Sequence, residues 1–416
     1  MKESRTLEWK ESVTNTFLKT VSAFANYDGG QILFGITDNG VVKGLENPKR
    51  ACLDIENKIN DSIAPQPDYT LCVQEEDKTV RLIIKGGINK PYLYKSRAYK
   101  RNDTATIEVD TLEFKRLVLE GKNLNFEELP SYSQQLSFKV LEEKMKKILG
   151  IKDFDKDVLK TLNLYSDQEG YNNAAAILAD KNQFPGIDIA RFGENISIIL
   201  KRVTYSHMSI LAAYENALNI YRDYYQYERI SGSVREHIER IPEAAFREAV
   251  ANALVHRLWD VKAHTQICMF DDRIEIISPG GLPTGISEQE YLSGRISVLR
   301  NPIIANVFYR LKIVEIFGTG ILRIMHIYEN SIRKPVFEIS ENMIKVVLPV
   351  IENVPDMTDD EKAIYRLLSK NCLKSISEIS SSADFGKTKV TGILKSLAKK
   401  GIVTIEGNGR GTKYRL

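Results

Sequence analysis

The sequence predicts an α+β protein made of several domains, and three observations support that fold class. The chain has 416 residues, more than a single hydrophobic core usually serves. Helix and strand signals follow one another irregularly, without the regular alternation that is typical of parallel α/β folds. A short segment with Pro355 and few apolar residues, 351–358, separates a compact basic tail from the rest and reads as a linker.

Composition narrows the class of protein. The chain is 43% hydrophobic and 27% charged, as expected of a folded protein with a buried interior. The amino terminus is polar, and no stretch approaches the roughly 18 apolar residues of a membrane helix. The four cysteines lie far apart and form no CxxC pair, which favours a reduced, cytoplasmic chain without structural zinc and without a membrane partner.

Positive charge is concentrated in two segments of the chain. Residues 78–102 hold eight basic residues and no acidic one, and residues 385–416 hold eight basic residues against one acidic. The rest of the chain is therefore acidic, since the formal net charge is only +3. Such clustering indicates contact with a phosphate backbone, although either segment alone is equally consistent with a solvated basic face.

Residues 1–128 are predicted to form the first domain. Apolar spacing predicts a helix over 16–25, which Gly29 and Gly30 end, and a buried strand over 31–36. Further strands are expected at 80–85 and 92–101, with a closing helix over 113–119.

Residues 131–350 are predicted to form the second and largest domain. Periodicity predicts helices over five segments and strands over three. The helices are expected at 138–149, 212–225, 243–258, 303–311 and 321–330, and the strands at 265–270, 274–277 and 343–349.

The tail, residues 359–416, is predicted to hold three helices and a hairpin. Thr358 is a candidate cap for a helix over 359–370, a short helix starts near 375, and a third helix spans 387–400. This order resembles a winged helix-turn-helix, in which the third helix enters the major groove of DNA. The resemblance implies contacts to nucleic acid from Lys387, Thr388, Lys389 and Arg410. Winged helices also serve as dimerisation or protein-contact modules, and that reading stays open.

The segment Phe246–His256 places three polar residues on one helix face, because Glu248, Asn252 and His256 recur every four residues. A carboxylate, an amide and an imidazole suit water, magnesium and phosphate respectively. The spacing resembles the N-box of the GHKL ATPases, an α/β sandwich fold. Residues 246–350 as a whole are similar to the "RecG-like" C-terminal module found in a family of transcriptional regulators.

That resemblance implies a nucleotide site for ATP with Mg²⁺, the metal being held through Asn252. The implied nucleotide-binding residues are Glu248, Asn252, His256, Gly280, Gly281, Gly318, Gly320 and Arg323. The sequence departs from the family at the position that recognises the nucleotide base. The family has an aspartate there, which hydrogen-bonds the adenine amino group, and this chain has Ser278. Specificity for adenine and hydrolysis are both in question, and Glu248 and Asn252 also fit ordinary polar positions. No Walker A sequence occurs.

The first domain carries a second resemblance. Glu3–Lys10, followed by the run Val21–Gly40 with its glycine-flanked strand, resembles the Schlafen/AlbA-like (AlbA_2) domain, whose members bind nucleic acid. Some Schlafens cut RNA with a metal-dependent acidic cluster. Glu3, Glu8 and Asp38 match that cluster, so the resemblance implies Mg²⁺ or Mn²⁺ there and a charge-stabilising role for Lys10. Equally, Glu8 and Lys10 fit a structural pair on a strand, and Asp38 fits a hairpin turn.

Two functions remain as hypotheses. The first is a nucleic-acid-binding regulator, with DNA preferred over RNA as its target, which works as a homodimer and responds to a nucleotide; weak ATPase activity is left open. Its basic contacts in the first domain are expected from Lys90, Lys95, Arg97, Lys100 and Arg101. The alternative is a metal-dependent endoribonuclease that acts on structured RNA such as tRNA, for instance in defence. A protein-only scaffold would show no salt-dependent affinity.

Overall fold

The structure is a computed structural model of the whole chain. It describes residues 2–231, 234–283, 285–294, 298–315, 318–351, 357–369, 372–407 and 409–416. The chain divides into two compact units. One consists of Met1–Leu129 and Pro283–Ile286, and the other of Pro130–Leu282 and Ser287–Leu416.

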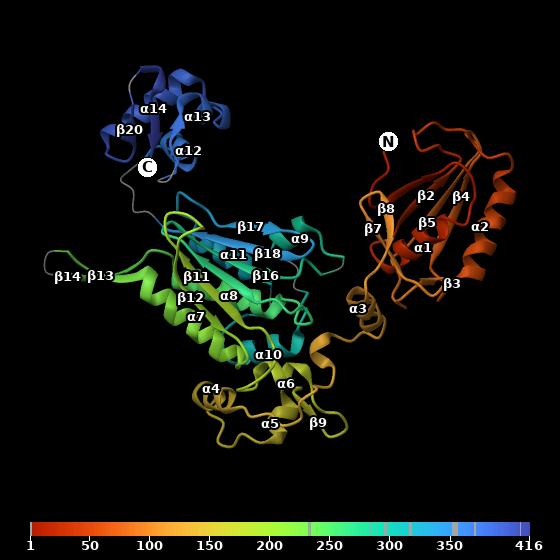
Figure 1. Ribbon diagram of the computed structural model, residues 1–416, viewed down its shortest axis with the longest axis horizontal. Helices are drawn as coiled ribbons and strands as arrows, with labels where there is room; N and C mark the ends of the chain where they lie inside the picture. The colour runs from red at the N-terminus through yellow and green to blue at the C-terminus, as the bar shows by residue number, and fades with distance from the viewer. Residues whose placement is uncertain are drawn as a thin grey trace. The chain divides into compact units, whose positions relative to one another are not determined.

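A four-stranded sheet forms the centre of the first unit (Figure 1). Its order is β1-β2-β5-β4, where β1 and β2 are parallel and the other pairs antiparallel. Helix α1 packs nine of its ten residues into the core. The elements of this sheet and its helices are β1 (Leu7–Lys10), α1 (Phe17–Asn26), β2 (Gly30–Phe34), α2 (Pro48–Ser62), β4 (Tyr69–Gln74) and β5 (Thr79–Ile84).

The glycine pair after α1 has a steric reason. A Cβ on Gly30 would lie 2.6 Å from the ring of Phe24, and Gly29 adopts a φ of +79°. Only glycine therefore lets the chain turn from α1 into β2 so closely. Buried Asn26 then fixes the loop opposite, because its side chain accepts from the Tyr92 amide and donates to the Tyr92 carbonyl.

The predicted strand over 92–101 is wrong as a single element. Lys95 and Ser96 have positive φ angles of 50° and 62°, so the chain turns there. The segment instead contributes to two separate two-stranded sheets, and the predicted closing helix follows them. They are β3 (Ile63–Ala64) with β6 (Leu93–Tyr94), β7 (Tyr99–Asn102) with β8 (Ala105–Glu108), then α3 (Thr111–Gly121) and the short 3-10 helix η1 (Phe126–Glu128).

A six-stranded sheet of order β12-β11-β15-β16-β18-β17 organises the second unit. Helix α7 packs on β11, and α8 packs on β16 and β18 (Figure 1). Among the described strands of this sheet, β11 and β15 pair in parallel and the other neighbours are antiparallel. The strands are β11 (Ile187–Phe192), β12 (Ile199–Tyr205), β15 (Thr265–Met269), β16 (Arg273–Pro279), β17 (Val336–Ile339) and β18 (Met343–Pro349).

The helices of this module are α7 (Ile210–Tyr225), α8 (Glu243–His256), α9 (Glu288–Leu292), α10 (Pro302–Arg310) and α11 (Gly320–Ile327). Four of them, α7, α8, α10 and α11, lie where periodicity predicted them, whereas α9 was not predicted. Between α7 and α8 the chain forms a separate ribbon, β13 (Gln226–Ser231) and β14 (Val234–Glu239), which the sequence did not indicate.

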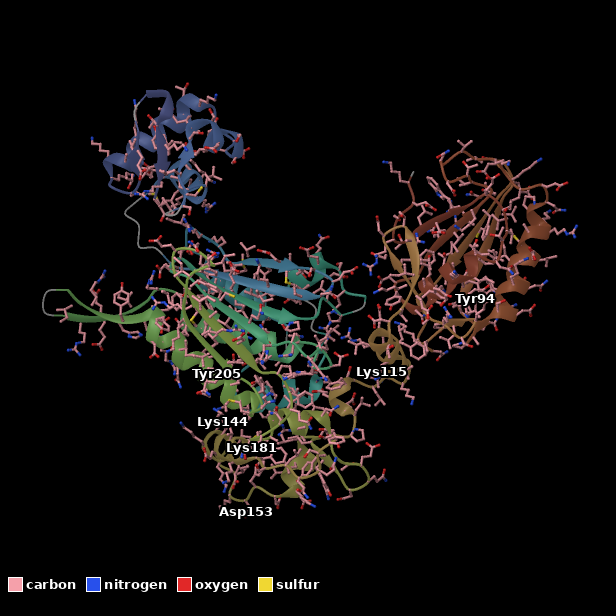
Figure 2. All side chains as sticks on the ribbon, in the orientation of Figure 1. Tyr94, Lys115, Lys144, Asp153, Lys181 and Tyr205 are labelled. Carbon is pink, nitrogen blue, oxygen red and sulfur yellow. The ribbon has the colours of Figure 1, made fainter. Side chains whose placement is uncertain are left out.

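A small subdomain precedes the sheet in the chain. It contains α4 (Lys139–Leu149), α5 (Lys156–Thr161), β9 (Tyr165–Ser166), β10 (Gly170–Tyr171) and α6 (Asn173–Leu178). Asn172 caps α6 by accepting from the Ala175 amide, and the alanines of α6 are fully buried. Lys144 of α4, which is labelled in Figure 2, pairs with Glu215 of α7 at 2.7 Å, and this ion pair ties the subdomain to the sheet module.

The carboxy-terminal residues form three helices and a three-stranded sheet of order β19-β21-β20. Thr358 caps the first helix, as predicted, but that helix ends at Arg366 rather than Lys370. Of the predicted linker, residues 352–356 lie outside the described part. The elements are α12 (Asp359–Arg366), β19 (Lys374–Ser375), α13 (Ile376–Ser382), α14 (Lys387–Lys399), β20 (Thr404–Glu406), η2 (Gly409–Gly411) and β21 (Lys413–Arg415).

Across the described ranges, none of the helices is long and apolar enough to cross a bilayer.

Candidate functional site

The polar face of α8 meets the start of α11. Asn252 Nδ2 donates to Glu248 Oε1 at 3.1 Å, and Arg323 of α11 pairs with the same oxygen at 3.2 Å. Both helices contact each other along this line. Three of the residues predicted for nucleotide binding therefore lie together, although they come from segments about 70 residues apart.

Gly320 makes this approach possible. A Cβ at that position would lie 2.4 Å from Glu248 Oε1 and 2.6 Å from Asn252 Nδ2, so a side chain there would have to displace the ends of these two side chains. Gly318, two residues earlier, has a φ of +70° and turns the chain into the helix. Phe317 lies outside the described residues. We call Glu248, Asn252, Gly320 and Arg323 the α8–α11 cluster.

The chemistry of the α8–α11 cluster suits an anion with a bound cation. The amino-terminal end of a helix favours negative charge, and an arginine offers a forked set of donors to phosphate. An amide and a carboxylate oxygen are ligands of the kind that Mg²⁺ accepts. Glu248 is mostly buried, with 12% of its side chain exposed, and its charge is balanced by Arg323.

The other predicted nucleotide-binding residues, His256, Gly280 and Gly281, lie at the carboxyl end of α8, beyond Asn252. The amides of Gly280 and Gly281 donate to the carbonyls of Asn342 and Glu341, at 2.8 and 3.1 Å. These two donors are therefore engaged by the β17–β18 turn. Burial, with the Arg300 guanidinium nearby, lowers the pKa of His256 to about 4, so its imidazole is neutral near pH 7.

Ser278 takes a structural role at the position of the family's aspartate. It is 5% exposed, and its hydroxyl donates to the Ala253 carbonyl of α8 at 2.7 Å. The Ser278 hydroxyl proton is thus engaged in a hydrogen bond within the protein. A serine at this position also supplies no carboxylate to accept a hydrogen bond from an adenine amino group.

Arg300 and Asn301 close the carboxyl end of α8. Arg300 donates to the carbonyls of His256 and Gly281, and buried Asn301 donates to those of Val255 and Arg257. The last carbonyls of a helix have no hydrogen-bond donor within the helix, and the side chains of Arg300 and Asn301 supply the missing donors. The pairing of Asn301 with α8 could not be predicted from the sequence, because the two segments are more than 40 residues apart.

The three acidic residues predicted for metal binding do not gather in the first unit. Glu8, 7% exposed, lies between Lys10, at 2.5 Å, and the buried Arg101. Glu3 accepts from the Trp9 amide at 2.8 Å, and Asp38 lies in an exposed turn. Within the described residues, no three His, Cys, Asp or Glu side chains are grouped so as to hold a metal ion.

Most basic residues of the first unit are engaged inside it. Lys90 is buried against Glu120, Lys100 pairs with Glu113, and Arg101 pairs with Glu8. Arg97 is exposed and pairs with Glu108. Lys95 is exposed beside the Tyr94 ring, 5.4 Å from its centroid; Tyr94 is labelled in Figure 2. Of the predicted contact residues, Lys95 and Arg97 are thus the ones available at the surface.

Helix α14 presents a basic outer face. Val390, Ile393, Leu394 and Leu397 are buried, while Lys387 and Lys395 are exposed. Lys389 is instead held by Asp360 at 2.7 Å and lies over the Phe385 ring. The side chain of Arg410 lies outside the described residues. Lys387 is therefore better placed than Lys389 to contact a phosphate.

Three family models match the chain. Residues 3–110 match "Schlafen, AlbA_2", residues 262–348 match "Putative ATP-dependent DNA helicase recG C-terminal", and residues 353–416 match "Sugar-specific transcriptional regulator TrmB". These matches define a class, that of DNA-binding regulators with an ATPase-like module. In chain order, the matched segments are similar to a Schlafen/AlbA_2 domain, a RecG C-terminal HATPase-like module and a TrmB-type winged helix, and the fold is α+β multidomain.

Two solved structures are similar at low identity. The DIP2311 protein from Corynebacterium diphtheriae is 19% identical, with a TM-score of 0.47 over 99% of this chain and 92% of that one. The N-terminal domain of a "Putative ATP-dependent DNA Helicase RecG-related Protein" from Nitrosomonas europaea is 23% identical, with a TM-score of 0.20 over 26% of this chain and 83% of that one. No curated protein matches the chain.

Proposed function

We propose that this protein is a DNA-binding regulator whose affinity for DNA responds to a nucleotide bound with Mg²⁺ at the α8–α11 cluster. The proposal rests on one observation: Gly320, the first residue of α11, lies in close contact with the side chains of Glu248 and Asn252. A phosphate bound at this helix end competes with Glu248 for Arg323, so binding would move α11 relative to α8. A nucleotide that favours one arrangement shifts the population of the two.

The DNA contact is assigned to α14. Lys387 and Lys395 are exposed, and neither has an acidic partner within the described residues. Each lysine that neutralises a phosphate releases counterions, so affinity falls steeply with salt. The exposed Lys95 and Arg97 of the first unit add a second, weaker contact on the same chain.

The test measures the affinity of the full chain for duplex DNA by fluorescence anisotropy at several salt concentrations. Replacing both lysines (Lys387→Ala with Lys395→Ala) is expected to reduce the slope of log K against log salt by about 2. Lys152→Ala, an exposed lysine of the subdomain, is the matched control and should leave the slope unchanged. An unchanged slope in the double variant would place the DNA contact elsewhere.

The nucleotide response is tested in the same assay with ATP and Mg²⁺. A coupling of 1–3 kcal/mol is typical of such systems and changes DNA affinity about 5- to 150-fold. Asn252→Ala should abolish the change while leaving DNA affinity without nucleotide as it was. Equal affinities with and without nucleotide would refute the response. In a separate assay, cleavage of tRNA that is abolished by EDTA and by Glu8→Ala would instead support the endoribonuclease.

A further inference from the structure

The ribbon β13–β14 leaves the sheet module between α7 and α8. Its two strands pair only with each other among the described strands. Figure 1 shows it extending from the end of α7. A two-stranded ribbon alone is marginally stable in water, and its outer edges carry unpaired backbone groups. We therefore expect the ribbon to be stabilised by contact with another protein surface.

The base of the ribbon is firmly held. Tyr225, the last residue of α7, donates its hydroxyl to the Phe270 carbonyl at 2.6 Å. Gln226 donates to Glu243 of α8 at 2.6 Å, and the Arg240 amide donates to the Tyr225 carbonyl at 2.8 Å. These bonds anchor both strands at their common end, so the direction of the ribbon is fixed by the module.

The surface of the ribbon suits a protein rather than phosphate. Ile230 is 74% exposed and Tyr227 is 48% exposed. Its arginines pair with its own acids, Arg229 with Glu236 at 2.8 Å and Arg235 with Glu228 at 3.1 Å. The ribbon therefore has no excess of positive charge for a nucleic acid backbone, while its exposed apolar side chains favour burial against another apolar surface.

Strand β12 presents a matching surface on the same chain. It is the outer strand of the six-stranded sheet, and Ile199 and Leu200 are 55% and 56% exposed. This edge begins close to the base of the ribbon, because Lys201 and Arg191 both lie over the ring of Tyr224, at 5.6 and 4.3 Å from its centroid. An open apolar edge strand is a template for pairing with another strand.

We propose that β13–β14 is a dimerisation arm, which binds the β12 edge of a second copy of this chain. The chain carries both halves of the contact, so a two-fold axis lets two copies exchange arms and closes the assembly. The charges are complementary, since residues 226–239 hold three glutamates against two arginines, and β12 carries the exposed Lys201. The proposal does not depend on nucleotide or DNA binding.

The test is sedimentation velocity of the full chain over a range of concentrations. The wild-type chain is expected to be dimeric at micromolar concentration. An arm variant (Tyr227→Ser with Ile230→Ser) and an edge variant (Ile199→Ser with Leu200→Ser) should each dimerise at least about 30-fold more weakly, as the loss of central apolar contacts does. Ile88→Ser, which changes an exposed isoleucine of the first unit, should leave dimerisation unchanged.

Mixing the two variants separates arm exchange from other modes of dimerisation. The arm variant keeps an intact edge and the edge variant an intact arm, so the mixed dimer retains one of its two contacts. It should form more readily than either variant alone. A wild-type chain that stays monomeric, or a mixture no tighter than its components, would overturn the proposal. Thermal melts followed by circular dichroism check that both variants still fold. The single change Ile230→Ser is a milder arm variant, to be used if the double variant is unfolded.

Discussion

Glu361 is predicted to hold the winged helix together. It begins α12 yet accepts hydrogen bonds from Ser396 and Lys400 at the end of α14, at 2.6 and 2.7 Å, and from the Thr358 amide at 2.9 Å. The carboxylate is 5% exposed. The change Glu361→Gln keeps the shape of the side chain but removes the charge, so it tests the electrostatic part of this contact.

The expected loss of stability is about 2 kcal/mol. Hydrogen bonds to a charged group contribute about 1.5–3 kcal/mol each, but glutamine keeps one acceptor and Lys400 is a third exposed. Hydrogen exchange of the α14 amides measures the opening of the winged helix, and the α8 amides of the same chain serve as the reference. The α14 amides should exchange about thirtyfold faster in the variant, since 1.4 kcal/mol is a factor of ten.

The same contact predicts a pH dependence. The bonds from Lys400 and Ser396, with that from the Thr358 amide, lower the pKa of Glu361 to about 2. The unfolded chain therefore binds the proton first as the pH falls. This part of the stability is complete above the ordinary glutamate pKa of about 4.3 and is lost towards pH 2. The wild-type domain should show this loss and the glutamine variant should lack it.

Glu406→Gln is the matched control for Glu361→Gln. Glu406 pairs with Arg415 at 2.8 Å on the surface of the same domain, with 41% of its side chain exposed. Such a surface pair contributes at most about 1 kcal/mol. Equal protection of α14 in the wild-type and Glu361→Gln chains, or the same acid sensitivity in both, would refute the assigned role of Glu361.

Three further changes test other parts of the structure. Asn301→Ala leaves two carbonyls at the end of α8 without their buried donor, which should lower the free energy of unfolding by about 2 kcal/mol in a thermal melt; an unchanged melting temperature would contradict this cap. Arg101→Ala removes a buried partner of Glu8 and should cost about 3 kcal/mol in urea unfolding followed by tryptophan fluorescence, whereas a cost below 1 kcal/mol would mean that Lys10 suffices. Gly320→Ala should displace the ends of the Glu248 and Asn252 side chains and, by loosening their contact with α11, speed hydrogen exchange of that helix; its control Gly392→Ala, where nothing lies within 4 Å, should slow exchange of α14 through helix propensity.

Local sequence pattern predicted the elements on which the α8–α11 cluster is built. The four-residue spacing of Glu248 and Asn252 placed them on one helix face, and α8 spans Glu243–His256. The glycine segment at 318–320 was expected near this face, and the structure brings Gly320 and Arg323 there. Whether these residues bind a nucleotide stays a prediction.

Other assignments depended on partners that the sequence does not reveal. Lys90 and Arg101 belong to a basic run, but each is buried against an acid from a distant segment, Glu120 and Glu8. A count of charges cannot tell a solvated lysine from one inside an ion pair. The glycines at 280–281 likewise suggested free amides, which the β17–β18 turn occupies.

The sequence by itself determined the order of the domains and most of their helices, because hydrophobic periodicity and capping are local properties of the chain. The winged helix illustrates this, since Thr358 and the apolar face of α14 were found where they were expected. Tertiary structure decided which polar groups are free. Glu8 of β1 is neutralised by Arg101 because β7, which carries Arg101, packs on α1, and this contact follows from packing over the whole domain.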